Sequence, residues 1–306
     1  MKGKRAKRII SLILTSILVL TLMMTGAGAV GDDSSNEPDL SKMYRKYDLE
    51  TGEVSLVPRY ASPQFANGIQ ITSTNPYFPN DGRDSFGDRS IIGSDDRTQV
   101  NLTTVAPYYA IARLVITYTD GTSAEGTGYM VSGNVMLTAG HCCMSAYSNA
   151  PISTLTAYLG QNGKYYKPMT ATLSSYYVCA NFTYYSDDDQ DDYAILVLST
   201  SPGNTTGWFG LSYQNNSFFT SHTFTITGYP TDKAEGTMWK ASGTVSSCST
   251  YVLNHTIDTA AGESGAPIYL SNVAYGIQVS GGSTVNHCRR MTQEVFDWLV
   301  AQGFIS

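Results

Sequence analysis

The sequence predicts an all-β protein, because three of its features agree. From residue 90 onward, short runs rich in β-branched and aromatic residues alternate with turn residues. Runs of helical periodicity are scarce, while Gly, Ser, Thr and Asn recur throughout. Only 14% of the 306 residues are charged, and 22 are tyrosines. This combination is typical of an exported β protein built as barrels or a sandwich.

The expected strands follow one another along the last two thirds of the chain. They cover residues 108–119, 128–137, 193–198, 218–227, 266–270 and 273–279. One helix is expected over residues 293–302, where four apolar side chains share a helical face. No repeat of fixed period is visible, so the strands belong to one large or two small domains.

Residues 1–29 are expected to be a signal peptide. Five basic side chains lie among the first eight residues, an apolar run covers residues 9–24, and Ala27-Gly28-Ala29 supplies small residues for cleavage. An uncleaved membrane anchor is the alternative, since the apolar run nearly spans a bilayer. We therefore expect a secreted, extracellular protein with no membrane attachment after the signal peptide is removed.

Residues 30–89 differ in composition from the rest of the chain. They are rich in Asp, Asn, Pro and Ser and contain only short apolar pairs. Such a segment is expected to bury little core and to be a propeptide. It ends in Gly87-Asp88-Arg89, which suits cleavage before Ser90. A flexible N-terminal extension is the alternative.

The charge of the remaining chain excludes one class of function. Residues 90–306 contain 8 basic and 15 acidic residues, a formal charge of −7 (8 − 15). A basic nucleic-acid-binding surface is therefore absent, and no nucleic-acid partner is expected.

Five cysteines follow the predicted signal peptide. Export permits disulfides, and the odd number leaves at least one thiol unpaired or intermolecular. Spacing does not fix the connectivity; the weak preference is for Cys142 or Cys143 with Cys179, and for Cys248 with Cys288. All five are expected to be structural, because a thiol next to a histidine in sequence is poorly placed to be activated by it.

Three motifs supply the parts of a hydrolytic site. They are Thr138-Ala139-Gly140-His141-Cys142, Asp192 at the start of an apolar strand, and Gly262-Glu263-Ser264-Gly265-Ala266-Pro267. A serine hydroxyl is a weak nucleophile and needs an adjacent base. Each motif alone is weak, but their joint occurrence in the order His, Asp, Ser is that of the chymotrypsin-type triad.

Each residue then receives an expected role. His141 removes the Ser264 proton and returns it to the leaving amine, while Asp192 fixes the imidazole tautomer. The N–H groups of Gly262 and Ser264 form the oxyanion hole. Asp191 is the alternative to Asp192, and the other acids of the run 187–192 are expected to be a solvated loop or, as the alternative, a calcium site.

Two other functional classes compete with this prediction. An α/β-hydrolase esterase fails on order, because its triad runs Ser, Asp, His and its helices are missing here. A catalytically inactive adhesion or binding module would usually lack a triad member, whereas His141, Asp192 and Ser264 are all present.

Five segments carry a resemblance to a known family. They are residues 90–100 (SIIGSDDRTQV), 228–233 (GYPTDK), 258–259 (DT), 281–283 (GGS) and 292–296 (TQEVF). With the triad motifs, they make the chain similar to the bacterial glutamyl endopeptidases of Bacillus and staphylococci, within the chymotrypsin-like serine proteases. The match covers essentially residues 90–299.

The resemblance implies two antiparallel six-stranded β-barrels with the triad between them. Residues 90–200 would form the first barrel and carry His141 and Asp192. Residues 201–306 would form the second barrel, carry Ser264 and end in a short helix. The resemblance also implies that residues 30–89 are removed near Arg89.

The substrate pocket departs from the family pattern. Gln278 stands where these enzymes carry a histidine that recognises the substrate carboxylate, and a glutamine amide donates hydrogen bonds without positive charge. Thr259 matches the second contact of this S1 pocket. Asp258 would instead select Arg or Lys if it lay at the pocket base. His287 either reaches the pocket or is a surface residue.

The sequence thus predicts a monomeric serine endopeptidase that acts on proteins or peptides without cofactor or metal. Cleavage after Glu or Asp is expected, with trypsin-like or broad specificity as the alternative. Glu263 is unusual beside the serine. If it is buried, the new amino group of Ser90 is expected to pair with it after cleavage.

Overall fold

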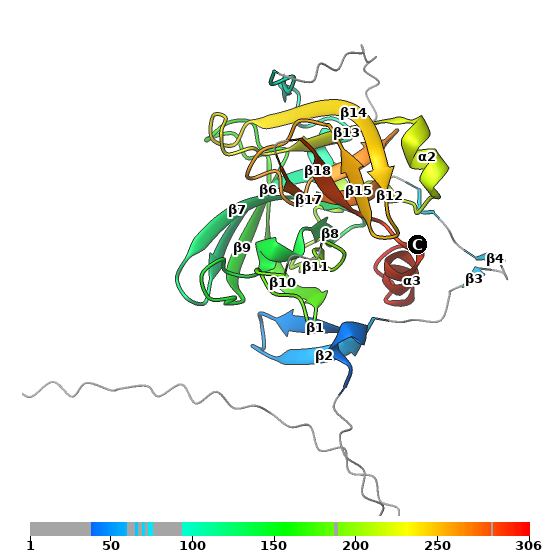
Figure 1. Cartoon of the computed structure of the whole chain (residues 1–306). Helices are drawn as coiled ribbons and strands as arrows, with labels where there is room; N and C mark the ends of the chain where they lie inside the picture. Colours follow the sequence, from blue (N-terminus) through cyan, green and yellow to red (C-terminus); the bar gives the residue numbers. More distant parts are fainter. Residues whose placement is uncertain are drawn as a thin grey trace, which may run out of the picture. The chain divides into compact units, whose positions relative to one another are not determined.

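Six antiparallel strands close the first barrel, drawn in green in Figure 1. The order is β11-β8-β7-β6-β9-β10, and a pairing of β11 with β10 closes it. The strands are β6 (Ile111–Tyr118), β7 (Ser123–Met130), β8 (Val135–Thr138), β9 (Ile152–Leu159), β10 (Met169–Cys179) and β11 (Ala194–Leu198).

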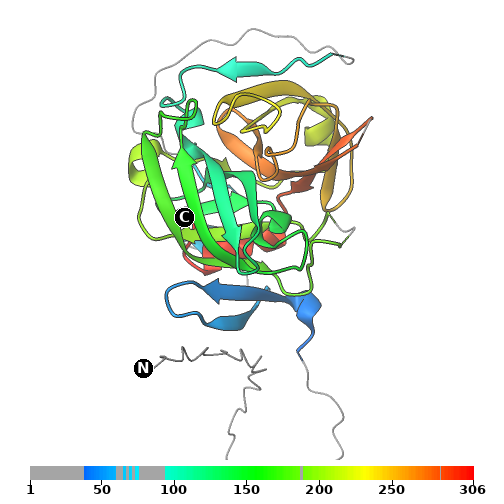
Figure 2. The same cartoon turned by 90° about the vertical axis from the view of Figure 1, so that its left-hand side faces the viewer.

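Six more antiparallel strands close the second barrel, which lies beside the first (Figure 2). The order is β17-β16-β13-β14-β15-β18, closed by a pairing of β17 with β18. The strands are β13 (Thr223–Gly228), β14 (Met238–Cys248), β15 (Val252–His255), β16 (Pro267–Leu270), β17 (Val273–Gly281) and β18 (Asn286–Arg290). Two six-stranded antiparallel barrels were predicted, and this prediction is confirmed.

The computed structural model describes residues 38–59, 65–66, 69–70, 73–75, 94–186, 189–282 and 284–306, and residues 38–306 form one compact unit. The predicted signal peptide (1–29) and the junction after Arg89 lie outside the described residues. In the part that is described, no helix is long and apolar enough to cross a membrane.

Short elements connect the barrels and border them. β5 (Thr98–Val100) pairs with β14, and β12 (Gly210–Leu211) runs parallel to β17. β5 therefore belongs to the second barrel, although it lies in the segment expected to build the first. The remaining elements are β3 (Phe65–Ala66), β4 (Ile69–Gln70), η1 (Leu40–Lys42), η2 (Tyr108–Ala110), η3 (Gly140–Cys143), α1 (Gly203–Thr206), α2 (Asn216–Ser221) and α3 (Gln293–Ala301).

Three of the predicted strands differ from the prediction. The strand expected over 128–137 is the end of β7 and most of β8, with residues 131–134 between them. The strand expected over 108–119 starts with the 3₁₀ turn η2. The strand expected over 218–227 starts only at Thr223, because residues 216–221 form α2. The side chain of Asn215 accepts the N–H of Phe218 at 3.0 Å, which caps this helix and makes its start favourable. The predicted C-terminal helix is present as α3.

The prediction that residues 30–89 bury little core is wrong for part of the segment. Residues 43–58 form a hairpin of β1 (Met43–Asp48) and β2 (Val54–Pro58), and β1 pairs with β10 of the first barrel. Tyr44 in this hairpin is fully buried. A buried aromatic ring and five paired residues explain why a segment of polar composition is ordered here.

The disulfide predictions are also wrong, since all five cysteines lie in the described part and are free thiols. Cys248 and Cys288 pair with Leu253 from opposite sides, so their Cα atoms are about 10 Å apart, beyond the roughly 7 Å that a disulfide spans. The Cys142 thiol lies 3.7 Å from the carbonyl oxygen of Ser264. Cys142, Cys143 and Cys179 are all buried, and none of them is bonded to another.

Candidate active site

The register of two neighbouring strands brings His141 and Asp192 together. Thr138, the last residue of β8, pairs with Ala194, the first residue of β11. His141 lies in η3, three residues after Thr138, and Asp192 precedes Ala194 by two residues. Both side chains therefore emerge at the same end of the first barrel.

Asp192 holds the histidine at two points. Its Oδ1 accepts the backbone N–H of His141 at 2.8 Å, and its Oδ2 lies 2.8 Å from Nδ1 of the same ring. Burial alone would lower the pKa of His141, but the Asp192 carboxylate outweighs it and the pKa lies well above 6.5. Asp191, the alternative from sequence, points elsewhere: its Oδ1 lies 2.9 Å from Nη1 of Arg59.

The serine turn is built on two glycines and joined to the first barrel. Gly262 and Gly265 have φ of +90° and +93°, a region that side chains with a Cβ rarely adopt. Thr127 on β7 donates its N–H to the Ser264 carbonyl oxygen (2.8 Å) and its hydroxyl to that of Gly262 (2.7 Å). Sequence reasoning missed Thr127, because nothing in its local motif marks these contacts.

The backbone beside Ser264 presents two free donors. Within the described residues, neither the N–H of Gly262 nor that of Ser264 has a hydrogen-bond partner, whereas the N–H of Glu263 between them donates to the carbonyl oxygen of Ala260 (3.0 Å). Two such N–H groups can donate hydrogen bonds to a developing oxyanion.

Two adjoining cavities are lined by the predicted triad residues. A cavity of about 440 Å³ is lined by His141, Asp192 and Tyr184, among others. A cavity of about 290 Å³ is lined by Ser264, Thr259 and Gln278. Val279 and Ser280 line both, so the cavity of the histidine and the cavity of the serine adjoin.

Residues 104–299, nearly two thirds of the chain, match the protein family described as Trypsin. The chain belongs to the trypsin family of serine proteases. It is accordingly a serine endopeptidase that acts on protein or peptide substrates.

Individual relatives show which members of the trypsin family this chain is similar to. A glutamyl endopeptidase from Bacillus licheniformis is 36% identical over 221 residues, which are 68% of this chain and 67% of that one. A Bacillus subtilis protein named extracellular metalloprotease is 39% identical over 214 residues, 68% of each chain. A solved Glu endopeptidase structure has a TM-score of 0.60 and 29% identity, and the match covers 70% of this chain and 99% of that one. The glutamyl endopeptidase resemblance is confirmed.

The wall of the smaller cavity contains a hydrogen-bond chain that ends at Thr259. His255 is fully buried, its Nδ1 accepts the N–H of Ile257 (3.2 Å), and its Nε2 lies 2.9 Å from Oε1 of Gln278. Burial lowers the pKa of His255 to about 4, so the neutral ring donates from Nε2. The Gln278 amide nitrogen in turn donates to the Thr259 hydroxyl (3.3 Å) and the Ser280 carbonyl oxygen (2.8 Å).

The series of hydrogen bonds from His255 to Thr259 determines which group donates and which accepts at each step. Because Oε1 of Gln278 accepts from His255, its amide nitrogen must face Thr259. The Thr259 oxygen accepts, and its hydroxyl hydrogen remains for a ligand in the cavity. Sequence reasoning missed His255, since it enters through strand packing and not through a motif near the serine.

Two other predicted pocket residues lie outside this cavity wall. Asp258 does not line it; its Oδ2 accepts the N–H of Asp96 at 3.0 Å. His287 lines the cavity of about 440 Å³ together with His141, and its Nδ1 lies 2.8 Å from Oδ1 of Asn254. Asp258, the acidic group that would attract Arg or Lys at a pocket base, is thus not among the described lining residues of this cavity.

Glu263 is buried and bound from two sides. Its Oε2 accepts the N–H of Ala260 at 2.8 Å and lies 3.4 Å from Nη1 of Arg97. Arg97 also pairs with Asp95 and Asp232. Burial raises the pKa of Glu263 to about 7 against these contacts. The expected partner Ser90 lies outside the described residues.

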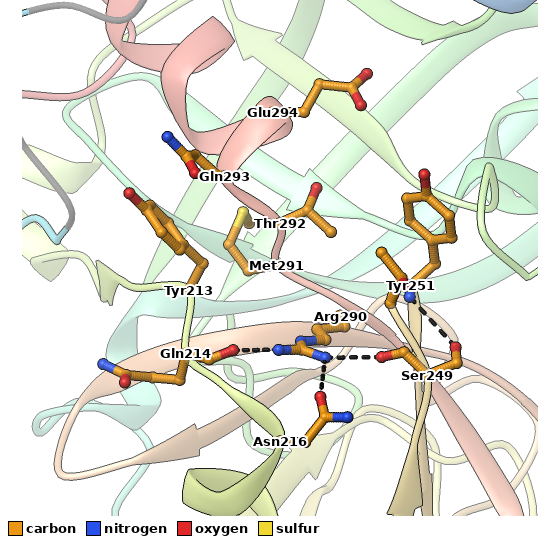
Figure 3. A pocket seen from close by; sticks show the side chains of 11 residues that line it. Tyr213, Gln214, Asn216, Ser249, Tyr251, Arg290, Met291, Thr292, Gln293 and Glu294 are labelled. Carbon is orange, nitrogen blue, oxygen red and sulfur yellow. Dashed lines mark hydrogen bonds between the residues drawn. The ribbon is translucent and has the colours of Figure 1, made fainter.

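A larger cavity, of about 670 Å³, lies apart from these groups and is shown in Figure 3. Its one cation is already bound: the Arg290 guanidinium donates to Asn216 (2.8 Å), to the Ser249 carbonyl oxygen (2.7 Å) and to the carbonyl oxygen of Gln214. Neither His141 nor Ser264 lines it, so we do not place the active site there.

The acidic run next to Asp192 offers little to a cation in the described structure. Asp187 and Asp188 lie outside the described residues, and Asp189 accepts the Ser280 hydroxyl at 3.1 Å. No group of three or more His, Cys, Asp or Glu side chains suited to a metal occurs in the ranges the structure covers.

Proposed function

We propose that this serine endopeptidase acts through His141, Asp192 and Ser264. The observation that supports this most is the two-point contact of Asp192 with His141 at a cavity adjoining that of Ser264. With Nδ1 bound to Asp192, Nε2 is the nitrogen that takes the serine proton. Asp192 keeps the resulting imidazolium stable.

The reaction then follows the acyl-enzyme route. Ser264 Oγ attacks the substrate carbonyl carbon while His141 takes the hydroxyl proton. The N–H groups of Gly262 and Ser264 bind the oxyanion. His141 passes the proton to the leaving amine, and a water molecule hydrolyses the acyl-enzyme by the same steps in reverse. No step requires a cofactor or a metal ion.

We propose cleavage after Glu or Asp. The proposed S1 cavity presents the Thr259 hydroxyl, held as a donor by Gln278 and His255, and none of its described lining residues is a carboxylate. Such a wall suits a substrate carboxylate and leaves an Arg or Lys side chain without a partner. The names of the glutamyl endopeptidase relatives agree with this direction.

We also propose that the protein is made as a secreted proenzyme and acts as a monomer. The signal peptide would be residues 1–29, and residues 30–89 would be cut from the enzyme after Arg89. The name of the Bacillus subtilis relative, which contains the word extracellular, supports export. N-terminal sequencing of protein from the culture medium should give Ser90.

The deciding experiment is digestion of a peptide library varied at the residue before the cut, with Ser264→Ala as control. We expect cleavage after Glu and Asp by the wild type and none by Ser264→Ala. Cleavage after Arg or Lys would contradict the proposed specificity, and equal cleavage by Ser264→Ala would contradict the triad. An inactive wild type would favour a binding module.

A further inference from the structure

The hairpin of β1 and β2 occupies a strand position in the first barrel. Residues 44–48 pair with residues 175–179 of β10, on the edge where β9 pairs only with residues 169–172. β1 thus pairs with the part of this β10 edge that β9 leaves unpaired (Figures 1 and 2). Without the hairpin, the second half of β10 would expose an unpaired edge, which natural sheets usually cover.

Aromatic contacts fix the hairpin against the barrel and α3. The Tyr44 ring is fully buried, with its centroid 4.4 Å from that of Trp298, and its hydroxyl lies 2.7 Å from the hydroxyl of Tyr193. Nε1 of Trp298 donates to the carbonyl oxygen of Pro58 at 2.9 Å. A buried aromatic pair with a hydrogen bond is typical of a permanent interface.

Arg59, directly after β2, reaches both chain neighbours of Asp192. Its Nη1 lies 2.9 Å from Oδ1 of Asp191, and its Nη2 donates to the Tyr193 hydroxyl at 3.2 Å. The side chain of Arg59 is 8% exposed and that of Asp191 is 10% exposed. Removal of Arg59 would leave the Asp191 carboxylate buried without this partner, which is strongly unfavourable.

A second part of the expected propeptide contacts the other barrel. The N–H of Thr74 donates to the carbonyl oxygen of Leu211 (2.9 Å), and its hydroxyl accepts the N–H of Leu211 (2.9 Å). Thr74 is 5% exposed. The segment before the predicted cleavage site is therefore held by β10 and by β12.

We propose that the hairpin segment, residues 38–59, stays bound to the first barrel after the chain is cut, as a non-covalent subunit of the active enzyme. In that complex Arg59 is a positioning residue, which fixes the loop of Asp191, Asp192 and Tyr193. The proposal rests on the proposed function, because it takes the cut after Arg89 from there. It differs from a propeptide that leaves once the enzyme is folded.

Retention of the hairpin can be tested without any protease activity. The full chain with Ser264→Ala receives a site for a specific added protease at residues 87–89, is cut, and is analysed by native size-exclusion chromatography and mass spectrometry. We expect the N-terminal fragment and residues 90–306 to co-elute in equal amounts. Separate elution of the fragment from a folded body would overturn the proposal.

Two variants sharpen the retention test. Tyr44→Ala removes the buried ring and should release the fragment after the cut. Lys42→Met is the matched control, because the Lys42 side chain is 60% exposed and pairs only with Asp39 of its own segment, so retention should be unchanged. Equal retention in both variants would contradict the assigned interface.

The positioning role of Arg59 has two measurements of its own. In the cut, otherwise wild-type enzyme, Arg59→Met should lower kcat about ten- to hundredfold with little change in KM, and Arg59→Lys should restore part of it. In the Ser264→Ala background, Arg59→Met should also shift or broaden the NMR resonance of the His141 Nδ1–H. Wild-type kcat and an unchanged resonance would overturn this role.

These measurements separate the two proposals from each other. If the uncut and cut wild type are both inactive while the fragment co-elutes, the proposed function fails and the subunit stands. If the body remains fully active after the fragment has been washed away, the enzyme stands and the subunit fails.

Discussion

At the scale of single residues, the contact between Asp192 and His141 carries the proposed chemistry. Asp192→Asn would present an amide N–H to Nδ1 and favour the wrong tautomer of the imidazole, so we expect kcat to fall about 10⁴-fold. Asp191→Asn is the comparison, because Asp191 lies against Arg59, and it should cost at least about a hundredfold less. Steady-state kinetics of both variants, with folding checked by circular dichroism, measures this. The reverse order would make Asp191 the carboxylate that orients His141.

Glu263 is a second residue whose effect can be measured, because it makes the stability of the protein depend on pH. Burial raises its pKa from 4.5 to about 7, so the folded state holds a proton that the unfolded state releases between these values. The contribution of Glu263 to stability is therefore fully present below pH 4.5 and declines by about 3 kcal/mol as the pH rises to 7 and beyond.

Glu263→Gln should remove this decline. Chemical denaturation of the wild type and of the variant at pH 4.5 and pH 7.5 gives the difference, and the contributions of all groups other than Glu263 are common to both proteins. We expect the variant to gain stability relative to the wild type at the higher pH. A constant difference between the two proteins across this range would show that Glu263 does not titrate in it.

At the scale of elements, the serine turn depends on its fit against β7 and β8. A Cβ on Gly265 would lie 2.0 Å from the Thr127 carbonyl oxygen and 2.2 Å from the Thr138 hydroxyl. Gly265→Ala should therefore lower the free energy of unfolding by at least about 3 kcal/mol. Gly163→Ala is the control: φ is also positive there (+77°), but nothing lies within 4 Å, and about 1 kcal/mol is expected. If both variants lost the same free energy of unfolding in urea denaturation, the whole effect would come from the positive φ.

The elements also show what the sequence could and could not predict. The strands of β6, β11 and β17 and the helix α3 were predictable because long apolar or periodic runs dominate their sequences. The hairpin of β1 and β2 was not, because its stability comes from the contacts of Tyr44 with residues far along the chain. Local composition carries no information on such a contact.

At the scale of the whole molecule, the site also contains residues that the sequence could predict and residues that it could not. The three triad motifs have local signatures, and the strand register places two of them together. His255 and Arg59 have no such signature: one lies behind Gln278, and the other enters from the segment expected to be cut away. The roles of His255 and Arg59 follow from how the barrels and the hairpin pack, and this packing cannot be read from a single sequence.

The packing of the whole molecule also determines its cysteine chemistry. All five thiols are free, and strand spacing prevents the pair expected between Cys248 and Cys288. We therefore expect reductant to leave the melting temperature unchanged. Thiol titration of the unfolded full chain, without reductant, should give five thiols per molecule.

This absence of crosslinks makes the barrels depend on their cores and on the hairpin alone. Tyr44→Ala, which loosens the hairpin, should therefore lower the melting temperature equally with and without reductant. Cys248→Ser provides the matched control, since Cys248 is the least buried of the five and its loss should have little effect. A reductant-dependent melting temperature, or fewer than five titrated thiols, would mean that a disulfide forms and that the strands shift to allow it.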